Sequence, residues 1–275
     1  MKDKYSAVWV SHSSIRDYIK CPRAYFLKNV YRDPKTNHKI SLMSPPLALG
    51  QAVHELVESL SVLPVSERFR VSLLIKLGEP WKKVSGKLGG FDDKMEEEKY
   101  LDRAKAMLAR VMDNPGPLAQ KAVKIRQVLP HYWLSEDDNI ILCGKIDWLE
   151  YVEKTESVRI LDFKTGKSDE DPDSLQLPIY YLLATHCQSR PVAGMSYWYL
   201  NRDDAPLDVP LPDEKKSYET IFDLAKRIQL ARKLELFVCP KNDGCSACRP
   251  LEAIVAGKAT YVGINGYKQD LYVLK

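Results

Sequence analysis

Two aspartates and a lysine near the middle of the chain have the types and spacing needed to cut phosphodiester bonds. Asp162 and Lys164 stand two residues apart at the end of an apolar run, and Asp147 lies in a similar run fifteen residues upstream. Because strand residues alternate faces, Asp162 and Lys164 are expected to point the same way, while Phe163 points into the core. If the two strands pair, both carboxylates and the ammonium converge, which suits a divalent metal ion and a water. The alternative is a surface strand end with a salt-bridged pair.

The composition is that of a chain with a real core and a mildly basic charge. Of its 275 residues 45 % are apolar, and the formal net charge is +4. This charge permits nucleic-acid binding without requiring it. No N-terminal apolar segment and no run long enough to span a bilayer are present, so we expect a cytoplasmic protein with no membrane partner. Six cysteines in such a chain favour free thiols or metal ligands over disulfides.

The apolar periodicity predicts an α/β core with helical additions at both ends. Helices are expected over residues 47–63, 66–78, 95–112, 174–187 and 214–236. Strands are expected over residues 123–134, 140–152, 158–163, 191–200, 260–264 and 270–274. Ser13 or Ser14 is expected to cap a first helix, and Pro22 to break it or to start a second one. Residues 31–46 and 82–94 are interpreted as loops, and the glycines of the second loop do not form an ATP-binding motif.

Three further residues have positions compatible with a site. His54 follows Gly50 in a predicted helix, where the glycine would let another backbone approach closely. Gln176 and Tyr180 follow Lys164 on the next predicted helix, and their spacing of four residues places them on one face. Each of the three could equally be an ordinary core or surface residue.

Taken together and in this order, these motifs resemble the PD-(D/E)XK nuclease superfamily. The motifs are Gly50 with His54, Gly144 with Asp147, Asp162 with Lys164, and Gln176 with Tyr180. The nearest resemblance is to the RecB-type exonuclease branch that includes the CRISPR-associated Cas4 nucleases, and the opening segment Ser11–Tyr25 fits it as well. The resemblance covers roughly residues 10 to 250 and implies a restriction-endonuclease-like core, with a mixed central sheet flanked by helices.

The resemblance also implies roles for these residues. His54, Asp147, Asp162 and the carbonyl of Phe163 would bind Mg²⁺ or Mn²⁺, with the imidazole favouring Mn²⁺. Lys164 would orient and help deprotonate the attacking water and stabilise charge on the phosphate. Gln176 and Tyr180 would position the scissile strand. The usual proline before the first aspartate is absent, because Ile146 precedes Asp147.

Three cysteines form a compact group near the C-terminal end. Cys239, Cys245 and Cys248 fall within ten residues, and the Cys245–Cys248 spacing is typical of a metal site. By resemblance, these three and Cys21 would hold a 4Fe-4S cluster that links the two ends of the chain. The family often places its third C-terminal cysteine after the Cys-x-x-Cys pair instead of before it, so tetrahedral Zn²⁺ is an alternative, as are free thiols. Cys143 and Cys187 lie in apolar contexts typical of core residues.

The expected organisation is one nuclease domain over residues 1–275. Within it we expect a helical insertion over 47–118, a catalytic core over 119–200, and cluster-binding ends over 8–30 and 237–250.

Basic residues with aromatic neighbours suggest contacts to a single strand. The basic residues are Lys20, Arg23, Lys28, Arg32, Lys121, Lys124 and Arg126. The aromatic residues are Tyr18, Tyr25, Phe26, Tyr31 and Trp133. Cations neutralise phosphates and rings stack on unpaired bases, although an ordinary solvated face would look the same.

The expected function is that of a metal-dependent DNA exonuclease acting on single-stranded ends or flaps, in repair and recombination or in CRISPR adaptation. One alternative is a DNA-binding module whose nuclease activity depends on a helicase or integrase partner. Another is a zinc-stapled nucleic-acid-binding protein with incidental carboxylates.

Overall fold

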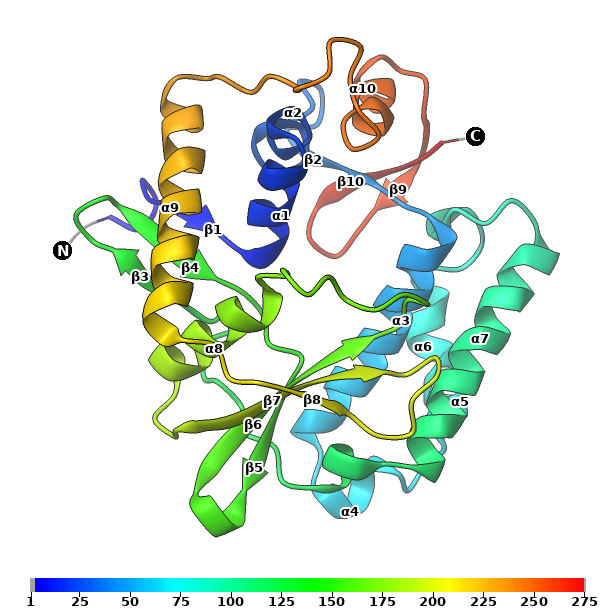
Figure 1. Ribbon diagram of the computed structural model, residues 1–275. Coiled ribbons are helices and arrows are strands. Elements are labelled where there is room, and N and C mark those ends of the chain that lie inside the picture. Colours follow the sequence, from blue (N-terminus) through cyan, green and yellow to red (C-terminus); the bar gives the residue numbers. More distant parts are fainter. Residues whose placement is uncertain (1–2, 275) are drawn as a thin grey trace. The chain divides into compact units, whose positions relative to one another are not determined.

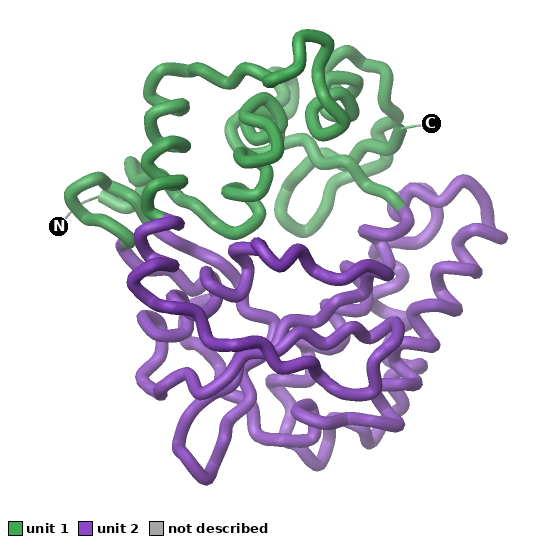
Figure 2. The backbone as a smooth tube through the Cα atoms, viewed as in Figure 1, with its two compact units in different colours: residues 1–44, 134–141, 222–275 green, residues 45–133, 142–221 purple. Residues whose placement is uncertain are grey.

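The computed structural model describes residues 3–274, and the chain divides into two compact units, coloured separately in Figure 2. Unit 1 is built from Met1–Ser44, Leu134–Ile141 and Phe222–Lys275, and unit 2 from Pro45–Trp133 and Leu142–Ile221. The expectation of a single nuclease domain with a helical insertion stays a prediction.

A four-stranded mixed sheet forms the centre of unit 2 (Figure 1). Its order is β5 (Trp148–Val152), β6 (Ser157–Lys164), β7 (Val192–Tyr199) and β8 (Leu207–Val209). β5 and β6 are antiparallel, β6 and β7 are parallel, and β7 and β8 are antiparallel. The parallel pair requires a crossover, which α8 (Gln176–Cys187) provides by packing on both strands.

The residue types of β6 explain its central place in this sheet. Val158, Ile160, Leu161 and Phe163 are all buried, so the strand has apolar side chains on both faces. β-branched and aromatic residues also favour the extended conformation. The turn before β6 is closed by Glu156, whose φ of 49° is left-handed. The last residues of this buried strand are therefore held in fixed positions.

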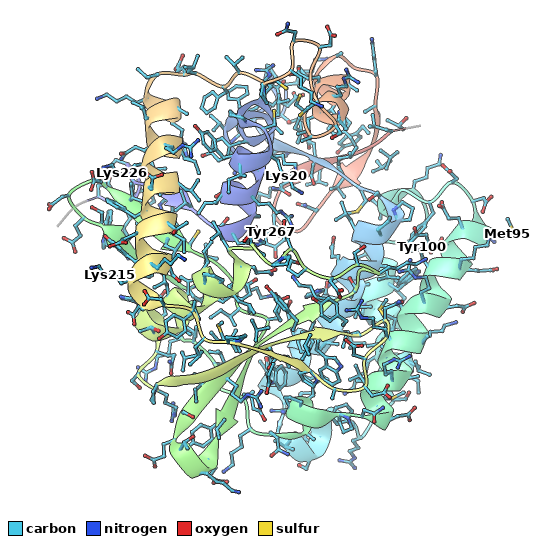
Figure 3. All side chains as sticks on the ribbon, viewed as in Figure 1. Lys20, Met95, Tyr100, Lys215, Lys226 and Tyr267 are labelled. Atoms are coloured by element: carbon cyan, nitrogen blue, oxygen red, sulfur yellow. The ribbon has the colours of Figure 1, made fainter. Side chains whose placement is uncertain are left out.

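Helices complete unit 2. The long helices are α3 (Pro45–Ser59) and α7 (Lys94–Asp113), which pack on each other. The short ones are α4 (Val65–Arg68), α5 (Leu73–Lys76), α6 (Gly78–Lys82), and the 3-10 turns η2 (Leu60–Val62), η3 (Gly86–Gly89), η4 (Gly116–Ala119) and η5 (Glu153–Thr155). The side chain of Asp93 caps α7 by accepting from the backbone N–H of Glu96, and Met95 projects from this end of the helix (Figure 3).

Unit 1 contains the two ends of the described chain. Its helices are α1 (His12–Lys20), α2 (Pro22–Tyr25), the π-helical turn η1 (Phe26–Val30), α10 (Arg249–Val255) and the C-terminal part of α9 (Glu214–Lys233). One sheet has the order β2 (Lys39–Leu42), β10 (Gln269–Val273), β9 (Thr260–Ile264), with β2 and β10 parallel. A second sheet has the order β1 (Val8–Val10), β4 (Ile140–Cys143), β3 (His131–Ser135), and the unit boundary falls within β3 and β4.

The expected α/β class and long helices are confirmed, while several shorter elements differ. The strand predicted over 140–152 is two strands, because Gly144–Asp147 leave the extended pairing, and only the end of 123–134 is a strand. The first helix is capped by Ser11, not by Ser13 or Ser14; Ser11 and Ser14 form a reciprocal capping box. Residues 31–46 contain β2, residues 249–255 form an unpredicted helix, residues 82–94 contain a 3-10 turn, and residues 66–78 form separate short helices. Among the described residues, no helix has the length and apolar character required to cross a bilayer.

Candidate functional site

Strand β6 presents Asp162 and Lys164 on one face. Lys164 Nζ lies 2.9 Å from Asp162 Oδ2. The Phe163 ring turns to the other face, with its centroid 6.5 Å from that of Trp148 and 6.1 Å from that of Trp198. The predicted alternation is confirmed. It leaves Asp162 only 1 % exposed, a burial that an ionised carboxylate tolerates only with charged or hydrogen-bonding partners.

The β5–β6 hairpin brings Asp147 to the same end of β6. The register pairs Trp148 with Leu161, so the residue before β5 stands beside the end of β6. Asp147 Oδ2 accepts a hydrogen bond from the backbone N–H of Phe163 at 3.0 Å. The expected pairing of the two strands is confirmed, although Asp147 lies just before its strand and not within it.

Helix α3 contributes the predicted imidazole of His54 and also the carboxylate of Glu58, which the motifs did not include. His54 Nδ1 lies 3.3 Å from Asp147 Oδ2 and 3.4 Å from Glu58 Oε1. One ligand atom from each of these three side chains falls within 4.8 Å of the others. Glu58 follows His54 by four residues, and this spacing on a helix was the signal that could have identified it.

Gly50, one turn before His54 on α3, makes room for the loop that follows β6. A Cβ atom at this position would lie 3.2 Å from Thr165 Oγ1, which is tighter than ordinary contacts. The close neighbour is thus a side chain, not a backbone as the sequence suggested. The glycine still lets α3 approach the end of β6.

Gln176, the first residue of α8, joins the two charged groups of β6. Its Nε2 donates to Asp162 Oδ1 at 2.6 Å, and its Oε1 accepts from Lys164 Nζ at 2.5 Å. The same Nε2 lies 3.3 Å from Tyr180 Oη, so the predicted shared face of Gln176 and Tyr180 is confirmed. The amide fixes the orientation of both Asp162 and Lys164.

Glu170 is a further carboxylate that the motifs did not include. Its Oε2 lies 2.9 Å from Lys164 Nζ, and it belongs to the segment between β6 and α8. No spacing rule points to it, because the segment has no regular structure.

The charges of the site shift one another's protonation. Burial and the neighbouring charge of Asp147 raise the pKa of Asp162 to about 7, against the opposing effect of Lys164. Burial lowers the pKa of His54, but Asp147 and Glu58 outweigh it and raise that pKa to about 10. Burial also lowers the pKa of Lys164, but the carboxylates of Asp162 and Glu170 outweigh this effect and raise that pKa. The carboxylates are thus crowded enough to favour an added cation.

This donor set fits a divalent metal ion. Carboxylate oxygens with one imidazole are ligands for Mg²⁺ and Mn²⁺. Asp162 Oδ2 is buried and, although close to Lys164 Nζ, receives no hydrogen bond of normal geometry. Glu58 Oε2 is in the same condition beside Lys145. Two buried oxygens with incomplete hydrogen bonding are what a metal ligand looks like without its metal.

Unit 1 contains a second group of possible metal ligands. The sulfurs of Cys21, Cys239, Cys245 and Cys248 all lie within 4.8 Å of one another, and all are free thiols. Cys21 precedes α2 and Cys248 precedes α10, while the other two lie in the segment between α9 and α10. The structure therefore brings together the four cysteines that the resemblance selected. Cys143 and Cys187 lie outside this group.

The surroundings of the cysteine group are apolar and its thiols differ. Cys21 and Cys248 belong to a buried cluster with Ala24, Leu27, Ile40, Leu251 and Ile254. Burial raises the pKa of Cys21 to about 12. Backbone hydrogen bonding by Cys248 lowers the pKa of Cys245 to about 6, so this thiol ionises much more readily than that of Cys21. A metal cation would favour the thiolate form of all four.

Several predicted nucleic-acid contacts are already neutralised within the protein. Arg23 pairs with Glu252, Lys28 with Asp17, and Lys121 with Glu153. Tyr25 is buried, and its ring packs edge-on against Tyr18. Arg32 has no ion-pair partner among residues 3–274. The basic segments therefore contribute fewer free cations than their sequences suggested.

The comparison with protein families agrees with this geometry. Residues 9–251 match the family model of the PD-(D/E)XK nuclease superfamily. No curated protein matches the chain closely enough to add a more specific relative. The mixed sheet flanked by helices is the restriction-endonuclease-like core of that superfamily. The match covers most of the chain, including both groups of possible metal ligands, and the chain therefore belongs to the PD-(D/E)XK nuclease superfamily.

Proposed function

We propose that this metal-dependent nuclease is a DNA exonuclease that acts on single-stranded ends or flaps. The observation that carries the proposal is the meeting of Asp147, Asp162 and Lys164 at the end of β6, opposite His54 of α3. His54, Asp147, Asp162 and the Phe163 carbonyl would bind Mg²⁺ or Mn²⁺. We add Glu58 to this set, because its carboxylate lies within reach of both His54 and Asp147.

The side chains divide the work of hydrolysis among them. A divalent ion, when bound, polarises the phosphate and lowers the pKa of a water. Lys164 orients the attacking water and stabilises the charge that develops on the phosphate. Gln176 holds the side chains of Lys164 and Asp162 in position relative to each other through its two hydrogen bonds. The Tyr180 hydroxyl accepts a hydrogen bond from Gln176 Nε2, and burial and the neighbouring carboxylates raise its pKa well above the usual value, so that it stays protonated and can help to position the scissile strand.

A preference for single strands is supported by cations and rings in unit 1. Arg32, Lys39 and Arg232 have no ion-pair partner in the described part of the chain, and burial together with the charges of the two arginines lowers the pKa of Lys39. The Phe26 ring lies 5.1 Å from that of Phe237 and 6.2 Å from that of Tyr31. Unpaired cations bind phosphates, and half-buried rings offer stacking surfaces for unpaired bases.

The cysteine group serves as a metal-bound staple within unit 1. The resemblance supports a 4Fe-4S cluster as its occupant. The sulfur spacing supports Zn²⁺, because the 3.8 Å between the sulfurs of Cys245 and Cys248 is close to the ~3.8 Å edge of a tetrahedron with ~2.3 Å Zn–S bonds. Purification without oxygen distinguishes them: a cluster gives a brown protein with iron and sulfide, and zinc gives a colourless one.

A paired assay tests the nuclease proposal. Wild-type protein and Asp162→Ala, both purified without oxygen, receive 5′- and 3′-labelled single- and double-stranded DNA with Mg²⁺ or Mn²⁺. We expect metal-dependent shortening of single strands by the wild type and none by the variant, with the label pattern giving the polarity. Cutting of closed circular DNA would replace the exonuclease assignment by an endonuclease.

The second candidate is a DNA-binding module whose cutting requires a helicase or integrase partner, in repair and recombination or in CRISPR adaptation. The observation that favours it is the resting state of Lys164, whose ammonium is already engaged by Asp162, Glu170 and Gln176. If the wild-type protein and Asp162→Ala bind single-stranded DNA equally and neither cuts it, this candidate replaces the first.

A further inference from the structure

The segment that links β6 to α8, residues 165–175, places a carboxylate on the catalytic lysine. We call this segment the strap. Its Glu170 is the second carboxylate on Lys164, at 2.9 Å from the ammonium nitrogen, the same distance as Asp162. The Glu170 side chain is 20 % exposed and that of Lys164 16 %, so the pair is shielded from water on most sides. A pair this buried is stronger than one on the surface.

The strap is fastened to β7 and to the turn after it, independently of the metal ligands. The backbone N–H of Glu170 donates to Tyr199 Oη at 3.0 Å. Asp169 pairs with Arg202, whose guanidinium carbon lies 4.2 Å above the centre of the Tyr199 ring. Tyr199 is the register partner of Lys164 on the neighbouring strand. The carboxylate of Glu170 is therefore held at Lys164 by the sheet itself.

The two carboxylates on Lys164 cannot have the same task. Asp162 stands beside Asp147 and His54, so its oxygens are shared with any metal ion bound there, and their attraction for the lysine is then reduced. Neither carboxylate is part of the group of possible metal ligands formed by His54, Glu58 and Asp147. Asp162 differs from Glu170 because the charges of Asp147 and His54 act on it directly, whereas Glu170 contacts Lys164 and, through its backbone N–H, Tyr199. With Gln176 neutral, Glu170 is the carboxylate that stays with Lys164 when the metal is bound.

We propose that Glu170 is a positioning residue, which holds the Lys164 ammonium in place for the reacting phosphate while Asp162 serves the metal. This inference rests on the proposed nuclease function. Without Glu170, the lysine turns fully onto Asp162 and competes with the metal for its Oδ2. The orientation of a charged group within a buried site affects the rate of reaction more than the binding of substrate.

A comparison of two amide substitutions on the strap tests the proposal. Glu170→Gln removes the charge beside Lys164. Asp171→Asn removes the same charge one residue away, where Asp171 is exposed and its carboxylate accepts from the backbone N–H of Asp173. We expect Glu170→Gln to lower kcat about tenfold with KM within twofold, and Asp171→Asn to leave both unchanged. Equal effects of the two variants, or a loss confined to KM, would overturn the proposal.

A double-mutant cycle with Lys164→Gln shows whether Glu170 acts through the lysine. We expect Glu170→Gln to add nothing to the residual activity of Lys164→Gln, because the group that it positions is already gone. A further tenfold loss in that background would refute the positioning role. Full activity of Lys164→Gln alone would instead refute the proposed catalytic mechanism, so the two failures are distinguishable.

Binding of Mn²⁺ without DNA supplies a measurement that does not depend on activity. Titration of Glu170→Gln with Mn²⁺ should give an affinity a few-fold weaker than wild type, because Lys164 then holds Asp162 more firmly. Glu170→Gln in the Lys164→Gln background should bind Mn²⁺ as Lys164→Gln does. If Glu170→Gln unfolds, Glu170→Ala takes its place in both titrations. Unchanged affinity in every variant would overturn the competition between lysine and metal.

Discussion

The carboxylate site of unit 2 and the cysteine site of unit 1 hold their ligands in contrasting ways. Most of the carboxylate site comes from one continuous stretch, Asp147 to Tyr180, which forms a hairpin, the strap and the start of α8. Only His54 and Glu58 come from elsewhere. The cysteine site joins Cys21 to three cysteines more than 200 residues further along the chain.

This difference in chain distance has consequences for stability. The carboxylate site forms as the sheet forms, and it buries like charges, which weakens the folded state until a cation is present. The cysteine site must close a long loop, whose entropy opposes folding. A metal bound by the four cysteines would supply folding free energy. In the roles that we propose, the carboxylate site gives up stability for chemistry, whereas the cysteine site adds stability and takes no part in the chemistry.

The largest expected effect comes from removing Asp162 alone. Asp162→Asn keeps the size of the side chain and its contact with Gln176 but removes the charge that pairs with Lys164 and that we propose serves the metal. We expect cleavage of labelled single strands to fall about 10³-fold or more. The metal content of the cysteine site, measured by elemental analysis, should not change. Loss of both together would show that the two sites are coupled and would end the division of roles.

Disrupting the cysteine site should have the converse effect: metal and stability are lost while catalysis is retained. Cys248→Ser removes one of the four proposed metal ligands, at a buried position, and we expect the metal to be lost and the free energy of unfolding to fall by about 4 kcal/mol. That corresponds to a fall of roughly 10 °C in the midpoint of thermal unfolding. Below that midpoint, kcat per folded molecule should stay within about twofold of wild type. Cys187→Ser, outside the group, is the matched control and should change neither the metal content nor the midpoint of thermal unfolding.

The same contrast explains what could be predicted from the sequence. Asp147, Asp162, Lys164, Gln176 and Tyr180 follow strand alternation and helix spacing, which are local rules, and their placement together follows from one hairpin and one crossover. Glu58 obeyed the helix rule but had no place in the motif order. Glu170 lies in a segment without periodicity, so only tertiary structure shows that it contacts Lys164.

The elements that the sequence missed fail for a related reason. Strand β2 lies in a polar, proline-containing segment, and it is a strand because β10 pairs with it in parallel from the other end of the chain. Helix α10 starts at Arg249 with Pro250 in its first turn, directly after Cys248 of the cysteine group. Both depend on partners far away in sequence, which a local pattern does not contain. The cysteines themselves were selected by resemblance, since their spacing alone left zinc, cluster and free thiols open.

Replacing Glu58 is expected to have a smaller effect, on the affinity for the metal. Such an effect would show that helix α3 contributes a ligand to the carboxylate site. Glu58→Gln keeps the shape of the side chain but removes the charge beside His54 and Lys145. We expect Mn²⁺ to bind about 10- to 100-fold more weakly, as measured by calorimetric titration. Glu55→Gln, on the same helix but paired with Lys83 at the surface, is the control and should bind Mn²⁺ normally. Equal affinity in both variants would remove Glu58 from the metal site.

The smallest expected effect is a proton released from His54 when metal binds. The pKa of His54 lies at about 10, because Asp147 and Glu58 outweigh the effect of burial, so the imidazole is protonated at pH 7 in the metal-free protein. A protonated imidazole cannot bind a metal, so Mn²⁺ must displace one proton, and its affinity should rise about tenfold per pH unit between roughly pH 6.5 and 8.5. In the metal-free protein, the contribution of His54 to the stability of the fold depends on pH in the opposite direction, falling as the pH rises. The raised pKa means that the charged His54 stabilises the fold fully below pH 6.5, its ordinary pKa, and that this stabilisation is lost as the pH rises through about 10.

Titration of Mn²⁺ in two buffers of different ionisation enthalpy counts directly the protons that are released when the metal binds. His54→Gln should lose this release while Glu55→Gln retains it; a wild-type affinity that does not change with pH would place His54 outside the metal site and leave the carboxylates of the hairpin as its ligands.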